Sequence, residues 1–265
     1  MNELSHTVSG DTLRPAVLFL HGFMGSAADW RSVVTAIEAE HQCIAVDLPG
    51  HGASLRLPPE AYSIEGAALM LLRLLHSLDA ECPAVVGYSM GGRLALYLAL
   101  RHPERCSRLF LESASPGIEG PVEREARRRV DEKKAARLES GDLKGFLTDW
   151  YRQPLFASLA RHEGLGLLRE TIEARLRNDP GELARSLRDM GTGKGPSLWG
   201  ELGALRSPAL AVAGEFDERY AGVAARMTSL SPRIRAAVVA GAGHNVRLEA
   251  PGTYLALLER SLAIS

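Results

Sequence analysis

The stretch from 85 to 93 limits what this chain can fold into more than any other part of the sequence. Two β-branched residues lead into Gly87-Tyr88-Ser89-Met90-Gly91, a G-x-S-x-G pattern, and a helix-forming run follows it. A turn of this kind between a buried strand and a helix holds its serine in a strained backbone conformation with the hydroxyl exposed. Both glycines are expected, because a side chain two residues either side of Ser89 would collide with the neighbouring strand or helix. The stretch predicts a nucleophilic serine at the end of a strand.

Other apolar runs predict the remaining strands of one sheet. Their continuous hydrophobicity is typical of strands buried on both faces of a parallel sheet. Amphipathic segments alternate with them, which predicts right-handed crossovers in a doubly wound α/β fold. The expected strands, beside the one before Ser89, are 16–20, 43–46, 109–111, 209–213 and 234–239. The expected helices are 28–40, 64–78, 94–100, 220–229 and 253–262.

The alternation stops at Pro116. Between 117 and 200 the sequence has no strand-like run, and charged residues are dense. The helical segments expected there are 122–138, 143–151, 163–177 and 182–190. We interpret 117–200 as an inserted all-helical cap over the C-terminal edge of the sheet, with 1–116 and 201–265 forming the core.

Composition excludes several classes of partner. The net charge of −1 gives no electrostatic reason to expect nucleic acid or an anionic membrane. Nothing approaches the ~20 apolar residues of a membrane span, so no stable membrane insertion is expected. The apolar run at 16–20 is too short for a secretory signal and lacks a basic leader. A cytoplasmic protein is the expectation.

Cys43, Cys82 and Cys106 are the three cysteines of the chain. Two of them lie in or beside expected buried strands. We interpret all three as reduced residues of the core or its edge rather than redox or metal-binding groups. The sequence predicts no metal site and no cofactor.

Three residues fit the chain order nucleophile, acid, histidine, which is one known order of a catalytic triad. Ser89 ends one strand, Asp217 follows a late strand, and His244 lies in a glycine-rich loop after the last strand. All three therefore stand at the same edge of a parallel sheet, where His244 can take the serine proton and Asp217 can orient the imidazole.

Other assignments remain open for two members of this triad. Glu215 or Asp47 could be the acid, and Asp217 could instead cap the helix that follows it. His21 and His51 are the rival bases, although each sits in a glycine-flanked loop that could simply need to be compact.

Two backbone N–H groups are expected to form an oxyanion hole. Met90 opens the helix after the serine, so its N–H has no partner in the preceding turn. Phe23 follows Gly22 in the loop after the first predicted strand and can supply the second N–H. Aromatic walls for the substrate are expected from Phe23, Tyr88 and Trp150.

Arg93 indicates what kind of substrate is bound. It falls in the first turn of the helix after Ser89, where the helix dipole disfavours a cation unless an anion is close. We infer a substrate carboxylate beside the nucleophile. Further arginines lie in the cap at 124–129 and 175–177, but most of them are expected to be solvated and paired with glutamates along their helices.

Several of these motifs together resemble the α/β-hydrolase superfamily over nearly the whole chain. They are His21-Gly22, Asp47-x-x-Gly50-His51-Gly52, the turn at Ser89, Asp217 and His244. The resemblance implies the α/β-hydrolase fold and the triad, while the superfamily hosts many reactions.

A narrower resemblance is to the 2-succinyl-6-hydroxy-2,4-cyclohexadiene-1-carboxylate synthases of menaquinone or phylloquinone biosynthesis. The segments that carry it are 87–96, 123–127, 149–156, 187–193 and 242–245. It implies a lyase that removes a carbon-bound proton and expels pyruvate from a cyclohexene tricarboxylate. It also implies that Arg93, Arg127 and Arg175 bind carboxylates, with Tyr88 and Trp150 lining the site.

Alternatives to this reading remain. Arg177 is as good an occupant of the third arginine position as Arg175. The runner-up function is a carboxylesterase or carbon–carbon-bond hydrolase with the same triad. A ligand-binding receptor without turnover is a third reading, which the intact triad disfavours. In each case the expected partner is a small molecule, a polycarboxylate for the synthase, and the sequence leaves the oligomeric state open.

Overall fold

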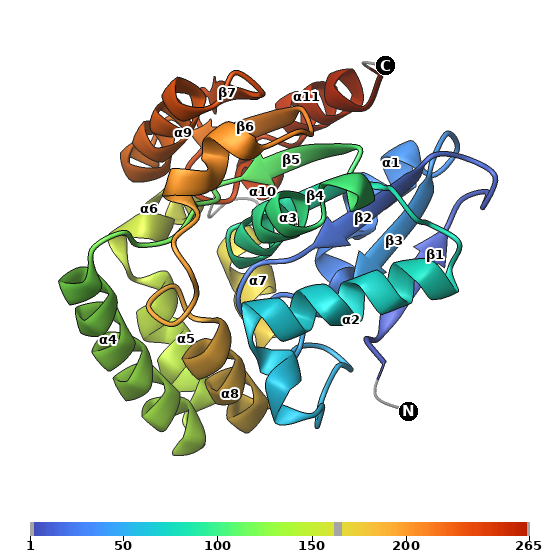
Figure 1. Cartoon of the computed structure of the whole chain (residues 1–265). Coiled ribbons are helices and arrows are strands. Elements are labelled where there is room, and N and C mark those ends of the chain that lie inside the picture. Colours follow the sequence, from blue (N-terminus) through green and yellow to red (C-terminus); the bar gives the residue numbers. More distant parts are fainter. Residues whose placement is uncertain (1–2, 162–165, 264–265) are drawn as a thin grey trace.

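A seven-stranded sheet forms the centre of the computed structural model, which describes residues 3–161 and 166–263 (Figure 1). The strand order is β1-β3-β2-β4-β5-β6-β7, and every neighbouring pair except β1 with β3 is parallel. The strands are β1 (His6–Ser9), β2 (Ala16–Leu20), β3 (Gln42–Val46), β4 (Ala84–Tyr88), β5 (Arg108–Glu112), β6 (Ala209–Gly214) and β7 (Ile234–Val239). The predicted doubly wound, mostly parallel sheet is confirmed.

Side chains alternate between the two faces of the sheet, and each face has its own hydrophobic cluster. On β2, Leu18 and Leu20 belong to one cluster while Val17 and Phe19 belong to the other. The first cluster contains residues of α2 (Ile64–Ser77), α3 (Met90–Arg101) and α9 (Glu218–Leu230), and the second contains residues of α1 (Arg31–Ile37) and α11 (Pro251–Ala263). Covered on both faces, the central strands can be apolar throughout.

Three short elements were not expected from the sequence. Strand β1 is antiparallel to β3 at the edge of the sheet, and its polar, partly exposed residues give no buried-strand pattern. The other two are α6 (Ala157–Ala160) and α10 (Val246–Glu249), each a single helical turn. Such short helices are stabilised by their tertiary contacts rather than by their own sequence.

Between β5 and β6 the described residues form helices and connecting loops. The helices are α4 (Pro121–Glu139), α5 (Leu143–Tyr151), α6, α7 (Leu167–Arg175) and α8 (Pro180–Met190). The helix expected over 163–177 is α7, and its first expected residues, 163–165, lie outside the described part of the chain. In Figure 1, α4, α5 and α8 lie to one side of the sheet, and α4 packs against α8.

The helices α4, α5 and α8 share a small hydrophobic cluster of their own. It includes Leu138 of α4, Leu147 of α5 and Leu183 of α8. Met24, in the loop after β2, also packs into it. The helical segment therefore rests on the loop that carries Phe23. None of the helices in the described residues is long and apolar enough to cross a membrane.

Candidate active site

Ser89 lies between β4 and α3 in a strained backbone conformation, with φ 49° and ψ −104°. Non-glycine residues rarely adopt positive φ, so the surrounding structure must hold it there. A Cβ on Gly91 would lie 2.2 Å from the Leu20 carbonyl oxygen, and one on Gly87 would lie 2.6 Å from the Gly91 carbonyl oxygen. Close backbone packing therefore explains why both positions are glycine, as the sequence predicted.

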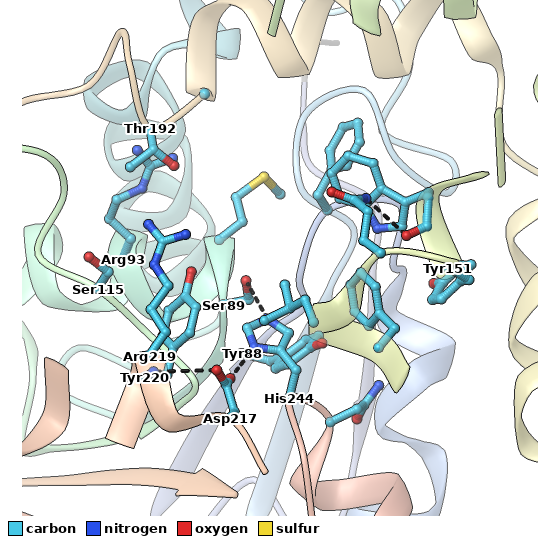
Figure 2. A pocket seen from close by; sticks show the side chains of 18 of the residues that line it. Tyr88, Ser89, Arg93, Ser115, Tyr151, Thr192, Asp217, Arg219, Tyr220 and His244 are labelled. Atoms are coloured by element: carbon cyan, nitrogen blue, oxygen red, sulfur yellow. Dashed lines mark hydrogen bonds and ion pairs between the residues drawn. The ribbon is translucent and has the colours of Figure 1, made fainter. Parts of the chain in front are cut away.

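The structure brings Ser89, His244 and Asp217 together (Figure 2). His244 Nδ1 lies 2.6 Å from Asp217 Oδ2, and Nε2 lies 3.4 Å from Ser89 Oγ. A carboxylate can only accept, so Nδ1 carries the proton and Nε2 is free to accept from the serine hydroxyl. Asp217 and His244 are both buried, which shields their hydrogen bond from water.

Asp217 serves two neighbours at once. Its Oδ2 bonds His244, while its Oδ1 accepts from the Tyr220 N–H at 3.3 Å and caps α9. The two readings of this aspartate, acid or helix cap, are therefore compatible, because each uses a different oxygen.

The rival acids bond to the backbone elsewhere. Glu215 is exposed and its Oε2 accepts from the Gly241 N–H at 2.9 Å. Asp47 accepts from the N–H groups of Ala27 and Ala53 at 2.7 and 2.9 Å. Neither carboxylate lines the cavity beside Ser89.

The rival bases His21 and His51 are buried against each other and also lie outside that cavity. His21 Nδ1 donates to the Gly22 carbonyl oxygen at 2.7 Å, and Nε2 accepts from the Leu48 N–H at 2.9 Å. These partners fix a neutral imidazole, and burial lowers the pKa of His21. His51 Nδ1 lies 3.0 Å from the Pro49 carbonyl oxygen, and burial lowers its pKa as well.

Phe23 and Met90 both line the cavity beside Ser89. Met90 is the first residue of α3, and Phe23 follows Gly22 in the loop after β2. Neither backbone N–H donates a hydrogen bond to an acceptor within the described residues. Two such groups beside a nucleophile can donate hydrogen bonds to an oxygen on which negative charge develops.

The cavity has a volume of about 510 Å³ and lies between the sheet edge and the segment from α4 to α8. Tyr88 forms part of the wall, with its ring centroid 5.5 Å from that of His244. Trp150 of α5 forms another part and lies 5.4 Å from the Phe23 ring. Lys134 Nζ lies 4.5 Å from the centre of the Trp150 ring. These side chains offer an apolar surface with a cation at its edge.

Arg93 is a buried cation in this cavity without a carboxylate partner among residues 3–161 and 166–263. One Nη donates to the Met190 carbonyl oxygen, and the other Nη is buried without a partner. Burial, followed by the charge of Arg127, lowers the pKa of Arg93 to about 10. The guanidinium is still charged at neutral pH, and an anionic ligand would stabilise it.

The other two arginines implied by the family resemblance also line the cavity, but each has an acidic partner. Arg127 Nε donates to Asp131 at 2.8 Å. Arg175 binds Asp29 through two hydrogen bonds of 2.7 and 2.6 Å, and this carboxylate raises its pKa against the effect of burial. Arg177 is exposed and does not line the cavity. Of the two candidates for the third position, the structure places Arg175 at the cavity.

Sequence reasoning missed several polar residues of the cavity. They are Lys134, Ser115, Gln153, Thr192, Arg219 and Tyr220. Arg219 had a signal that could have found it, because it falls in the first turn of a helix, where a cation is unfavourable. No group of three or more potential metal ligands occurs in the described part of the chain.

Comparison with known proteins places this geometry in a family. The sequence profile of the α/β hydrolase fold matches residues 15–251. The chain is 31% identical to the 2-succinyl-6-hydroxy-2,4-cyclohexadiene-1-carboxylate synthase of Escherichia coli O1:K1 / APEC, covering 94% of each protein. It belongs to this synthase family of α/β hydrolases.

Two further matches agree with this family. The solved structure of MenH from S. aureus has a TM-score of 0.91 and 30% identity, covering 99% of this chain and 98% of that one. Protein PHYLLO, chloroplastic, of Arabidopsis thaliana is 33% identical over 97% of this chain. The chain spans 16% of the length of PHYLLO.

Proposed function

We propose that the protein is a lyase of menaquinone or phylloquinone biosynthesis. It eliminates pyruvate from 5-enolpyruvoyl-6-hydroxy-2-succinyl-cyclohex-3-ene-1-carboxylate and releases 2-succinyl-6-hydroxy-2,4-cyclohexadiene-1-carboxylate. Membership of the synthase family supports the reaction. The observation that carries it is Arg93, a buried cation without an acidic partner in the described residues, in the same cavity as Ser89. Such a site suits a polyanion and gives little benefit to a neutral ester.

In the proposed mechanism Ser89 acts as a base and forms no covalent bond. His244 Nε2 takes the hydroxyl proton, and the alkoxide removes the ring proton α to the succinyl carbonyl. The N–H groups of Phe23 and Met90 stabilise the enolate oxygen. The enolate electrons then form a ring double bond at the deprotonated carbon, the original ring double bond shifts by one position, and the carbon–oxygen bond to the enolpyruvyl group breaks. His244 returns its proton to that leaving oxygen, and the enol becomes pyruvate.

We further propose that residues 117–200 act as a cap on a core made of 1–116 and 201–265. The support is their contribution to the cavity: Arg127 comes from α4, Trp150 from α5 and Arg175 from α7. A cap of this kind would exclude water while the carbanion exists. The substrate is a small molecule, and a cytoplasmic location stays a prediction from the sequence.

The decisive experiment supplies the cyclohexene tricarboxylate and measures pyruvate. The wild type should release one pyruvate per ring product, and Ser89→Ala and His244→Ala should each lower turnover by several orders of magnitude without unfolding. Asp217→Asn should also be impaired, while Glu215→Gln, on the exposed rival acid, should stay near wild type. Near-normal turnover by Asp217→Asn would show that another acid orients His244.

The competing function is ester or carbon–carbon-bond hydrolysis by the same triad. The close approach of His244 to Ser89 favours it equally, because an activated serine can attack a carbonyl. Mass spectrometry of quenched reactions separates the two. Unmodified Ser89 with stoichiometric pyruvate supports the lyase, whereas a trapped acyl-serine, or nitrophenyl-ester turnover without pyruvate from the cyclohexene, supports the hydrolase.

A further inference from the structure

The cavity beside Ser89 holds more positive than negative charge. Of the described residues that line it, the cations are Arg93, Arg127, Lys134, Arg175 and Arg219, and the carboxylates are Asp217 and Glu218. Arg127 and Arg175 are paired with Asp131 and Asp29, and Asp217 is engaged by His244. Arg93, Lys134 and Arg219 form no ion pair with the part of the chain described here. The unpaired charges are therefore available to a ligand.

Two of these unpaired cations lie on one side of Ser89. Arg219 comes from the first turn of α9, and its side chain extends toward Arg93 in Figure 2, on the side of Ser89 opposite Tyr151. The guanidinium carbon of Arg219 is 5.8 Å from the centre of the Tyr220 ring. Arg219 is exposed and lines the cavity without an ion pair in the described residues, so its guanidinium is free to turn toward a bound carboxylate.

Neutral donors complete this side of the cavity. The Tyr220 ring packs edge-on against His244 at 4.8 Å, and its hydroxyl end reaches into the cavity in Figure 2. Burial raises the pKa of Tyr220, so its hydroxyl stays protonated and can donate. Thr192 and Ser115 line the same side with their hydroxyl groups. Cations and hydroxyl donors around one space are the chemistry that binds a carboxylate.

We propose that Arg219, with the Tyr220 hydroxyl, completes a carboxylate-binding subsite with Arg93, and that Arg219 determines specificity for a substrate anionic at this position. The proposal rests on the proposed function and names which residues hold one carboxylate of that substrate. Because Arg219 and Tyr220 lie in the first turn of the helix that Asp217 caps, the same helix turn positions the triad acid and this subsite. Arg175, in contrast, has its charge already matched by Asp29.

The test compares Arg219→Ala and Arg219→Lys with the matched control Arg235→Ala, which removes an exposed arginine of β7 outside the cavity. With the cyclohexene tricarboxylate, Arg219→Ala should raise KM about tenfold and change kcat by less than about threefold, the effect of losing one charge-assisted hydrogen bond to bound substrate. Arg219→Lys should recover part of the loss, and Tyr220→Phe should weaken binding less than Arg219→Ala. Arg235→Ala should match the wild type.

Calorimetry with propane-1,2,3-tricarboxylate makes the test independent of turnover. Arg219→Ala should weaken its binding about tenfold, and Arg235→Ala should not. Wild-type affinity in Arg219→Ala, or no saturable binding by the wild type, would overturn the subsite. If binding follows these expectations but no pyruvate is released, the subsite stands and the proposed reaction fails. If pyruvate is released equally by wild type and Arg219→Ala at low substrate concentration, the reaction stands and the subsite fails.

Discussion

At the scale of single residues, His21 controls the direction of a peptide group in the proposed oxyanion hole. The Gly22 carbonyl and the Phe23 N–H belong to one planar trans peptide, so they point in opposite directions. His21 Nδ1 holds that carbonyl at 2.7 Å, and Leu48 N–H fixes the other ring nitrogen. The imidazole therefore positions the Phe23 N–H without touching substrate.

This arrangement predicts a difference between two substitutions of His21. In His21→Asn the side-chain amide can still donate to the Gly22 carbonyl, whereas His21→Leu cannot. We expect His21→Leu to lower kcat about tenfold or more with little change in KM, since oxyanion donors act in the transition state. His21→Asn should retain more of kcat. Equal kcat in both variants, at equal thermal stability, would contradict a positioning role.

The proposed carboxylate-binding arginines should differ sharply from exposed arginines nearby. Arg93→Ala and Arg127→Ala should each lower kcat/KM by the equivalent of about 2–5 kcal/mol, because a desolvated carboxylate loses its charged partner. Arg129 lies on the same helix as Arg127 but is exposed and pairs with Glu125. Arg129→Ala should change stability by under ~0.5 kcal/mol and leave activity near wild type. Similar losses in all three variants would argue against substrate carboxylates at Arg93 and Arg127.

At the scale of elements, the end of α7 fastens the helical segment to the loop after β2. Arg175 binds Asp29 with both Nη groups, and Asn178 Nδ2 donates to the Met24 carbonyl oxygen at 2.9 Å. Met24 directly follows Phe23 in that loop, and Asp29 lies in the short helical turn after it. The residue that the family resemblance presents as a carboxylate ligand therefore also connects two parts of the fold.

A double-mutant cycle tests this connection. Arg175→Met alone leaves Asp29 buried without its cation, and breaking a buried pair in this way costs about 3–5 kcal/mol of unfolding free energy. Asp29→Asn combined with Arg175→Met should cost clearly less than the sum of the two single changes. Urea unfolding measures all four proteins, and strict additivity would show that the pair contributes no coupling.

The sequence predicted best those helices and strands whose burial leaves a clear hydrophobic pattern. The expected spans 143–151 and 234–239 agree with α5 and β7, because one has a clear amphipathic period and the other a strand pattern between turns. Strand β1 was not predicted because its polar, partly exposed residues show no buried-strand pattern. Helices α6 and α10 were not predicted because a single helical turn is too short to show a helical period. The triad positions were accessible because strand ends meet at one edge. The ion pair of Arg175 with Asp29 could not be predicted, because no local sequence pattern links residues that lie so far apart in the chain.

At the scale of the whole molecule, buried titratable groups act in opposite directions as pH falls. Burial lowers the pKa of His51. On acidification the unfolded chain therefore binds a proton at this residue that the native protein does not bind, and the free energy of unfolding falls below about pH 6.5. Burial raises the pKa of Glu112 to about 7. As pH falls through 7, the native protein therefore binds a proton at Glu112 before the unfolded chain does, and the contribution of Glu112 to the free energy of unfolding increases.

Removing either group should change the acid sensitivity in a defined direction. His51→Phe should lose less stability than the wild type between pH 7.5 and 5.5. Glu112→Gln, which keeps an acceptor for the Arg247 N–H, should lose more. The measurement is the urea unfolding free energy at both pH values, read as a difference within each protein so that pH-independent packing effects cancel. The same pH difference in all three proteins would contradict these assignments.

The two hydrogen bonds of Asp217 restrict how the chain can change by single mutations. Asparagine would preserve the start of α9 but give up the negative charge opposite His244, while glutamate would keep the charge on a longer side chain poorly suited to cap the helix. In a library that randomises 215–220 and selects for turnover, aspartate should therefore be recovered at 217 far more uniformly than any residue around it.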